Sequence, residues 1–300
     1  MKSSSEIIRT ARSLGIGIPA FNIAHLPMTE PVIRAVADQD SFALIEVSRI
    51  DWMKFGARSP AAVIDEFNKW MKPDHVRMHL DHVPVIDEDG KRVDYRAVIS
   101  DAISRGYQSV MVDASRLQLE ENIRATREVA EIAHKAGVPC ESELGAVLGH
   151  EAGPLPPYEE LFASGRGFTD PGEAARFVRE TGCDWLSVAV GNIHGAISGA
   201  ARDRKKVEAR LNVEHLRRLF DATGVPLVLH GGSGIQAEYL RQAVQNGIAK
   251  INIGTEIRQA FERGIAETGE VAKGQEAVAE SIRNLVREVY RIEGSAKRLE

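Results

Sequence analysis

Short apolar runs alternate with longer amphipathic segments along almost the whole chain. Runs such as Ser-Val-Met-Val at 109–112 and Leu-Ser-Val-Ala-Val at 186–190 are nearly apolar throughout, which is typical of parallel strands buried on both faces. Runs of this kind predict strands at 16–21, 42–47, 76–80, 109–112, 138–142, 185–190, 226–229 and 248–252. Apolar residues at helical spacing predict helices near 28–38, 60–71, 95–105, 119–136, 171–181, 212–222, 235–246 and 255–267.

Eight β–α units with no Gly/Ser/Pro-rich linker between them predict a single (β/α)8 TIM barrel, and 300 residues suit that fold. We expect one domain, with the barrel and a short N-terminal helix at 1–269 and a helical extension at 270–300. Ser3 and Glu6 have the spacing of a capping box for that first helix. A doubly wound open sheet is the alternative, but no Gly-x-Gly-x-x-Gly after a strand supports dinucleotide binding.

Two segments fall outside the β–α rhythm. Residues 144–170 form a long Gly/Pro-rich connection after the fifth strand, and loops of that length are often functional lids. Residues 270–300 look helical and charged, and their sparse apolar stripe is expected to pack against the barrel or another subunit. The stripe consists of Val278, Ile282, Leu285 and Val289.

Composition narrows the class of protein. The chain has 38 Lys and Arg against 43 Asp and Glu, so it has no basic surplus for a nucleic-acid backbone. Its apolar runs are of strand length, which argues against a membrane partner, and its first residues do not resemble a secretory leader. Two cysteines, Cys140 and Cys183, are too few for a disulfide framework and are expected to be buried thiols. We therefore expect a cytoplasmic protein.

Polar or ionisable residues stand at the end of every predicted strand. In chain order they are Asn22; Glu46 and Ser48; His79, Asp81 and His82; Asp113; Glu141 and Glu143; Asn192 and His194; His230; and Asn252 with Thr255. Because active sites of (β/α)8 barrels are built at the carboxyl ends of the strands, this distribution predicts an active site there.

Three histidines at these strand ends suggest a metal site. His82, His194 and His230 follow the third, sixth and seventh strands. Three imidazoles that leave a fourth position open are typical of catalytic zinc. His79 lies two residues before Asp81 on the same strand face, and we expect His79 and Asp113 to support the ligands from behind.

Glycines after the seventh and eighth strands suggest a phosphate site. The sequence His-Gly-Gly-Ser-Gly at 230–234 would let backbone N–H groups approach an anion. Gly254 and Thr255 open the next helix, and barrels often bind phosphate with these two loops.

Carboxylates near the predicted metal site supply acid–base chemistry. Asp81 can exchange a proton with a substrate hydroxyl. Glu143 can either bind the metal transiently or lie behind the metal ligands. Glu151 is either a base brought in by the long loop or a solvated loop charge. Metal, phosphate and acid–base groups together predict chemistry beside the carbonyl of a phosphorylated sugar, through an enediolate.

Seven motifs together resemble the class II, metal-dependent fructose-bisphosphate and tagatose-bisphosphate aldolases. They are the residues at 20–22, 79–82, 110–115, 141–145, 191–195, 229–234 and 250–256, in order between about residue 5 and residue 265. The resemblance implies a zinc-dependent barrel that reversibly cleaves a ketose bisphosphate to dihydroxyacetone phosphate and an aldehyde. It also implies a sodium or potassium ion near the phosphate, and a homodimer or homotetramer.

The resemblance also implies roles for individual residues. Zinc ligands would be His82, His194 and His230, with Glu143 near an alternative metal position. Asp81 would move the proton of the hydroxyl that becomes the aldehyde, and Glu151 the proton on the dihydroxyacetone phosphate carbon. The substrate would be held by Gly195, Gly231, Ser233, Asn252 and Thr255, and the expected set also includes Asn22, Ser48 and Gly254.

Four departures from the family pattern leave the aldehyde half of the substrate open. They are residues 196–198, His150 beside Glu151, residues 46–52, and an insertion-like loop at 83–87. They favour a different or less phosphorylated acceptor. Two other functions use similar parts, namely a metal-dependent sugar-phosphate epimerase or isomerase and a non-catalytic phosphosugar-binding barrel. The presence of all three histidines with Asp81 and Glu151 favours the aldolase.

Overall fold

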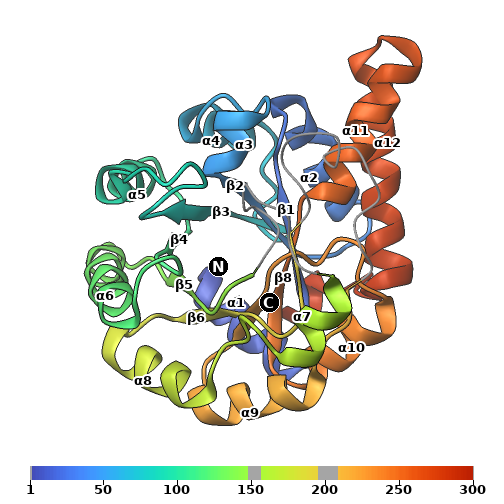
Figure 1. Ribbon diagram of the computed structural model, residues 1–300. Helices are drawn as coiled ribbons and strands as arrows, with labels where there is room; N and C mark the ends of the chain where they lie inside the picture. The colour runs from blue at the N-terminus through green and yellow to red at the C-terminus, as the bar shows by residue number, and fades with distance from the viewer. Residues whose placement is uncertain (1, 148–156, 195–208, 300) are drawn as a thin grey trace.

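The computed structural model describes residues 2–147, 157–194 and 209–299, which form a closed barrel of eight parallel strands ringed by helices (Figure 1). The barrel closes where β8 pairs in parallel with β1. The strands are β1 Ile18–Asn22, β2 Ala43–Ser48, β3 Val76–Pro84, β4 Ser109–Asp113, β5 Cys140–Leu144, β6 Trp185–Val188, β7 Leu227–Leu229 and β8 Ile248–Ile253. The TIM-barrel prediction is confirmed, and the strand bounds agree to within two residues except at the end of β3.

Helices connect the strands on the outside of the barrel. They are α1 Ser4–Ser13, α2 Thr29–Ala37, α3 Arg49–Lys54, α4 Pro60–Trp70, α5 Tyr95–Ser104, α6 Leu119–Lys135, α7 Tyr158–Ser164, α8 Pro171–Thr181, α9 Val213–Thr223, α10 Ala237–Gln245, α11 Thr255–Thr268, α12 Val271–Asn284 and α13 Ala296–Leu299, with a 3-10 turn η1 Leu26–Met28 and a π-helical turn η3 Leu285–Val289. The predicted capping box begins α1, because Ser3 Oγ accepts the Glu6 N–H and Glu6 Oε2 accepts the Ser3 N–H.

Each strand has two unlike faces. The outward face packs apolar side chains such as Phe21, Ile45 and Leu80 into the core beneath the helices. The inward face carries polar and charged side chains, and Glu46 and Lys250 are fully buried there. Branched apolar residues usually fill the interior of a TIM barrel, so this charged interior is unusual for the fold.

The third strand continues to Pro84, beyond its predicted end at residue 80. Its register against β4 shifts between Leu80 and Val83, which marks a bulge at Asp81 and His82. The predicted loop at 83–87 is therefore wrong at its first two residues, because Val83 and Pro84 still pair with β4, whereas residues 85–87 lie beyond the strand. The bulge interrupts the apolar alternation, so the sequence pattern ends the strand too early.

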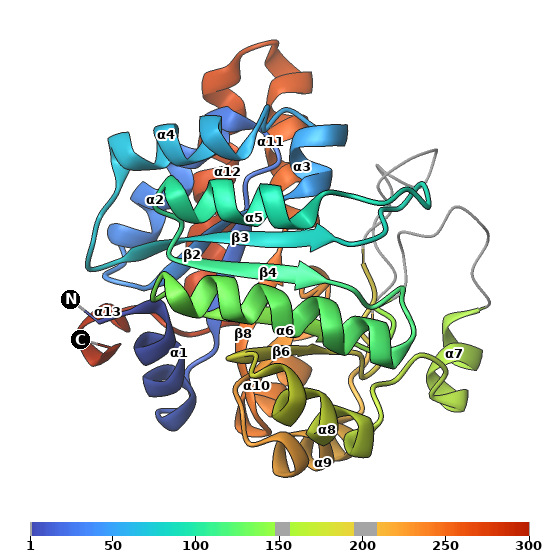
Figure 2. The ribbon, with the colours of Figure 1, turned by 90° about the vertical axis from the view of Figure 1, so that its left-hand side faces the viewer.

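The predicted continuous connection at 144–170 is wrong in its second half, which contains α7. Tyr158, Leu161 and Phe162 have helical spacing, and Leu161 is buried. The Tyr158 hydroxyl donates a hydrogen bond to the Gly191 carbonyl, which ties α7 to the segment after β6. Figure 2 shows α7 near the end of the barrel toward which the β3 and β4 arrowheads point.

The C-terminal extension packs on the outside of the barrel. α12 lies against α11 and α2, and it joins α11 at Gly269, a left-handed residue (Figure 1). Val278, Ile282 and Leu285 of the predicted stripe are buried, so this stripe packs within the chain. Figure 2 shows both termini at the end of the barrel where the strands begin, away from the predicted site.

Two other predictions concern the whole chain. Cys140 and Cys183 are free and buried, and burial raises the pKa of both thiols. Within the described ranges, no helix has both the length and the apolar character needed to cross a bilayer.

Candidate active site and metal centre

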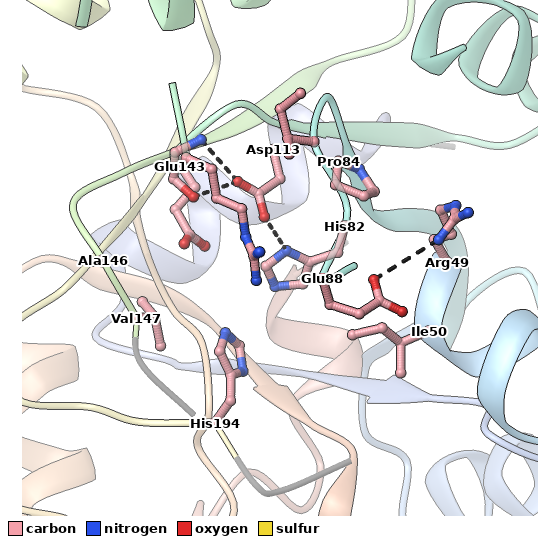
Figure 3. A pocket seen from close by; sticks show the side chains of 13 residues that line it. Arg49, Ile50, His82, Pro84, Glu88, Asp113, Glu143, Ala146, Val147 and His194 are labelled. Atoms are coloured by element: carbon pink, nitrogen blue, oxygen red, sulfur yellow. Dashed lines mark hydrogen bonds and ion pairs between the residues drawn. The ribbon is translucent and has the colours of Figure 1, made fainter. Parts of the chain in front are cut away.

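Three histidines from distant parts of the chain meet at the carboxyl end of the barrel. His82 lies in the β3 bulge, His194 follows β6 and His230 follows β7. Each offers one ring nitrogen, and the three atoms lie within 4.8 Å of one another. The His82 ring centroid is 4.3 Å from that of His230 and 5.3 Å from that of His194. Figure 3 shows His82 and His194 on the same cavity.

His82 is oriented by an aspartate on the neighbouring strand. Its Nδ1 lies 3.1 Å from Asp113 Oδ2, while its buried Nε2 has no hydrogen-bond partner in the described part of the chain. Its backbone φ of 32° is left-handed, a strained conformation for this residue type that the bulge imposes. Burial lowers the pKa of His82, but Asp81, Asp113 and Glu143 outweigh it and raise the value to about 10. The same negative surroundings favour a divalent cation.

His230 has a similar arrangement on the opposite wall. Its Nε2 lies 2.9 Å from Glu141 Oε1. Its Nδ1 lies 3.1 Å from Glu143 Oε2. This nitrogen makes no hydrogen bond to any described residue. Asn192 fixes the backbone here by donating from Nδ2 to the His230 carbonyl at 3.0 Å.

These side chains fit a bound metal ion. In metal sites, a ligating histidine commonly uses one ring nitrogen for the metal and gives the other to a carboxylate, which fixes the tautomer. This arrangement is present at His82, which contacts Asp113, and at His230, which contacts Glu141. In each ring the second nitrogen is buried and makes no hydrogen bond to a described residue. Glu143 forms a second group with His82 and Asp113 within 4.8 Å, which fits its predicted alternative metal position.

Asp81 lies directly beside this centre. Its two carboxylate oxygens accept hydrogen bonds from Asn22 Nδ2 at 3.0 Å and Asn252 Nδ2 at 2.9 Å. Burial raises the pKa of Asp81, but His82 and Lys250 outweigh burial and hold the pKa below its ordinary range. Asp81 is therefore an ionised, oriented carboxylate that can accept a proton.

The loop after β2 has a role that the sequence did not reveal. Ser48 caps α3, and its hydroxyl donates to Asp51 Oδ2 at 2.8 Å. Asn22 Nδ2 also lies 3.4 Å from the same Asp51 oxygen. Asp51, which sequence analysis did not single out, therefore links two predicted substrate-binding residues.

The predicted phosphate-binding loops lie side by side. Ser233 Oγ accepts the Glu256 N–H at 3.4 Å, so the loop after β7 touches the first turn of α11. Gly254 is the N-cap of that helix. Gly231 has a φ of 65°, and a Cβ there would lie 2.1 Å from the Ile193 carbonyl oxygen, so only glycine fits. The first N–H groups of a helix favour an anion, which suits a phosphate here.

Two predicted residues, Glu151 and Gly195, lie outside the described residues, as do His150 and residues 196–198. His79 contacts none of the three histidines by hydrogen bond within the described chain. Its Nδ1 lies 2.8 Å from Ser109 Oγ, and its Nε2 lies 3.5 Å from Glu141 Oε2.

Sequence analysis also missed the roles of Glu141 and Lys250. Lys250 Nζ lies 2.9 Å from Glu141 Oε2 and 3.2 Å from Glu46 Oε2, and all three side chains are fully buried. Strand alternation places Glu141 on the same face of β5 as Glu143 and Lys250 on the same face of β8 as Asn252, but it does not pair the two residues.

A cavity of about 190 Å³ extends outward from the histidines (Figure 3). One side is formed by His82, Asp113, Glu143 and His194. Arg49, Ile50 and Glu88 lie together on the other side (Figure 3), and Arg116 also lines the cavity. Arg49 is held by Asp87 at 3.3 Å and Glu88 at 3.8 Å, so its guanidinium is fixed at the cavity wall.

A (β/α)8 barrel with histidines and carboxylates clustered at its mouth is typical of TIM-barrel metalloenzymes. A family model described as fructose-bisphosphate aldolase class-II matches residues 2–298. The chain belongs to the class II fructose-bisphosphate aldolase family, whose members are metal-dependent carbon–carbon lyases.

Individual relatives agree with this family. The chain is 32% identical to a fructose-bisphosphate aldolase of Geobacillus stearothermophilus over 270 residues, which is 88% of this chain and 84% of the relative. It is 46% identical to Escherichia coli YdjI over 180 residues, 59% of each chain. The crystal structure of the YdjI aldolase matches with a TM-score of 0.75 and 30% identity, covering 98% of this chain and 99% of that one.

Proposed function

We propose that the protein is a zinc-dependent aldolase that reversibly cleaves a phosphorylated ketose, of the fructose- or tagatose-1,6-bisphosphate type, to dihydroxyacetone phosphate and an aldehyde. The observation that carries the proposal is the meeting of three histidine nitrogens within 4.8 Å, beside the Asp81 carboxylate that Asn22 and Asn252 orient. Three imidazoles with an open fourth position favour catalytic zinc.

His82, His194 and His230 would hold the zinc ion, which would act as a Lewis acid and stabilise the enediolate that forms when the carbon–carbon bond breaks. In the cleavage direction, Asp81 accepts the proton of the hydroxyl whose carbon becomes the aldehyde. The carbon–carbon bond breaks and its electron pair passes to the dihydroxyacetone phosphate half. Asn22 and Asn252 keep the Asp81 carboxylate oriented for this transfer.

The second proton transfer is assigned to Glu151, which would return a proton to the dihydroxyacetone phosphate carbon. This role rests on the family resemblance alone. Glu151→Ala should slow exchange of that carbon-bound proton with solvent deuterium while dihydroxyacetone phosphate still binds. Exchange at the normal rate would remove Glu151 from the mechanism.

The phosphate would lie at the start of α11, against Gly231, Ser233, Gly254 and Thr255. Contact between the two loops supports this placement, because it gathers backbone N–H groups and a helix N-terminus at one place. Gly195 is proposed as a further phosphate contact from the sequence alone.

We assign the aldehyde half to the cavity wall formed by Arg49, Ile50 and Glu88. Arg49 and Ile50 come from residues 46–52, and Glu88 directly follows residues 83–87, two segments that depart from the family pattern. The Arg49 charge is balanced by Asp87 and Glu88, so this wall offers hydrogen-bond donors and acceptors suited to hydroxyl groups. Arg49→Met should raise the KM for the aldehyde and leave proton exchange on dihydroxyacetone phosphate unchanged.

The direct test offers dihydroxyacetone phosphate with a panel of phosphorylated and unphosphorylated aldehydes, with and without chelator. We expect ketose phosphate products that disappear with chelator and return with zinc. Interconversion of sugars without carbon–carbon bond formation would instead show an epimerase or isomerase, and binding without turnover would show a non-catalytic barrel.

A further inference from the structure

A fully buried lysine lies beneath the proposed metal centre, on the inward face of β8. The Lys250 side chain has no exposed surface, and its ammonium group is surrounded by three carboxyl groups from three other strands. Nζ lies 2.9 Å from Glu141 Oε2, 3.2 Å from Glu46 Oε2 and 4.0 Å from Asp81 Oδ1. Removing a charge from water is costly unless it is paired, so this cluster needs its cation.

Glu141 connects this lysine to the metal centre. Its Oε2 faces Lys250 and its Oε1 faces His230 Nε2, at 2.9 Å in both cases. The ammonium group therefore pairs with one oxygen of the carboxylate, while the other oxygen contacts the imidazole. That contact leaves the other His230 nitrogen, Nδ1, without a hydrogen bond to a described residue, 3.1 Å from Glu143 Oε2 and available to a metal ion.

We propose that Lys250 is a positioning residue for the metal centre, acting through Glu141 to set the orientation and tautomer of His230. This inference rests on the proposed function, because it assumes that His230 is a ligand. Lys250 contacts none of the three histidines directly among the described residues, and Glu141 is the carboxylate that links it to His230.

Glu46 provides an internal comparison. It shares the same ammonium group and is equally buried, but it makes no contact with His230 within the described chain. If Lys250 only balanced the charge of Glu46, removing both charged groups would restore the zinc affinity that is lost with Lys250 alone. If Lys250 positions His230 through Glu141, removing Glu46 as well would leave the zinc affinity as low as in the Lys250 variant.

The test is a pair of double-mutant cycles read out as the zinc dissociation constant of metal-depleted protein, measured by competition with a chromophoric chelator. One cycle combines Lys250→Met with Glu141→Gln, and the other combines Lys250→Met with Glu46→Gln. Methionine keeps the length of the lysine side chain without its charge. Lys250→Gln replaces Lys250→Met if the methionine variant does not fold.

We expect Lys250→Met and Glu141→Gln each to weaken zinc binding by about 10- to 100-fold, the range for loss of a residue that supports a metal ligand. Lys250→Met/Glu141→Gln should bind zinc no more weakly than whichever of the two single variants binds it less tightly, because both changes break the same chain of contacts. Glu46→Gln should bind zinc normally, and Lys250→Met/Glu46→Gln should bind as weakly as Lys250→Met. In metal-free protein, ring 15N shifts should show His230 protonated at Nε2 in the wild type and a tautomer mixture in Lys250→Met.

Unchanged zinc affinity in the folded Lys250 variant would overturn the inference, and so would full recovery in Lys250→Met/Glu46→Gln. The control for the proposed metal site is His230→Ala. If that variant keeps its zinc, the metal site itself is wrong. If it loses zinc while Lys250→Met binds normally, only the role of Lys250 is wrong.

Discussion

His79 and Leu80 are neighbours on β3, and both are completely buried, but they face opposite environments. Leu80 belongs to the apolar core outside the barrel. His79 faces the interior, where it contacts Ser109 and lies 3.5 Å from Glu141. The same division recurs on β8, where Ile251 lies in the apolar core and Lys250 in the charged interior.

This comparison suggests that the two faces of one strand serve separate needs. The outward face is built from side chains whose burial stabilises the fold by about 1.5–3 kcal/mol each. The inward face buries ionisable groups, which favours folding little and serves instead to orient the site. Substitutions on the inward face should therefore change metal binding or catalysis first, and substitutions on the outward face should change the free energy of unfolding first.

The largest effect is expected for His230→Ala on the inward face. Losing one of three proposed ligands should abolish both stoichiometric metal binding and activity. Metal content after dialysis, measured by atomic emission, checks this. Full metal content in the folded variant would show that the ligand set is wrong.

Asp81→Ala separates metal binding from catalysis on that face. The variant should keep its metal and lose cleavage by about 10²- to 10⁴-fold, the range for loss of a general acid or base. Steady-state cleavage rates and metal content measured on the same sample check this. Wild-type activity would remove Asp81 from the reaction.

Asp113→Asn tests the support of His82. The amide has the shape of the carboxylate but not its charge, so His82 loses the partner that orients its ring. We expect zinc affinity to fall by about 10- to 100-fold. Chelator competition measures the change, and an affinity equal to that of the wild type would show that the ring is held by other contacts.

Leu80→Ala should have the smallest effect on the site although it lies next to Asp81. Truncating a buried leucine should lower the free energy of unfolding by about 2–5 kcal/mol. The folded protein should bind zinc as tightly as the wild type. Urea unfolding of the metal-free protein and zinc titration together check this, and a large loss of zinc affinity would show that the two faces are coupled.

Much of the fold was readable from local sequence. Apolar runs and helical periodicity placed seven of the eight strands and most helices to within two residues, because the outward-facing positions of the strands are apolar. The bulge at Asp81 and His82 was not readable, since alternation ends where the backbone shifts register. α7 was missed because the Gly/Pro-rich residues before it obscured its helical spacing.

The site was readable only in part. The histidines and Asp81 stood out because each follows a predicted strand. The link between Glu141 and Lys250 did not, because β5 and β8 are not neighbours in the barrel and meet only across its interior. No local pattern encodes a contact that depends on closure of the barrel.

The central claim is that His82, His194 and His230 hold one metal ion. The most direct measurement is an anomalous difference map, recorded at the zinc edge from crystals of the zinc-loaded protein. The account predicts a single strong peak about 2.0–2.1 Å from one nitrogen of each of the three rings. A peak elsewhere, or one within bonding distance of fewer than three of these rings, would contradict it.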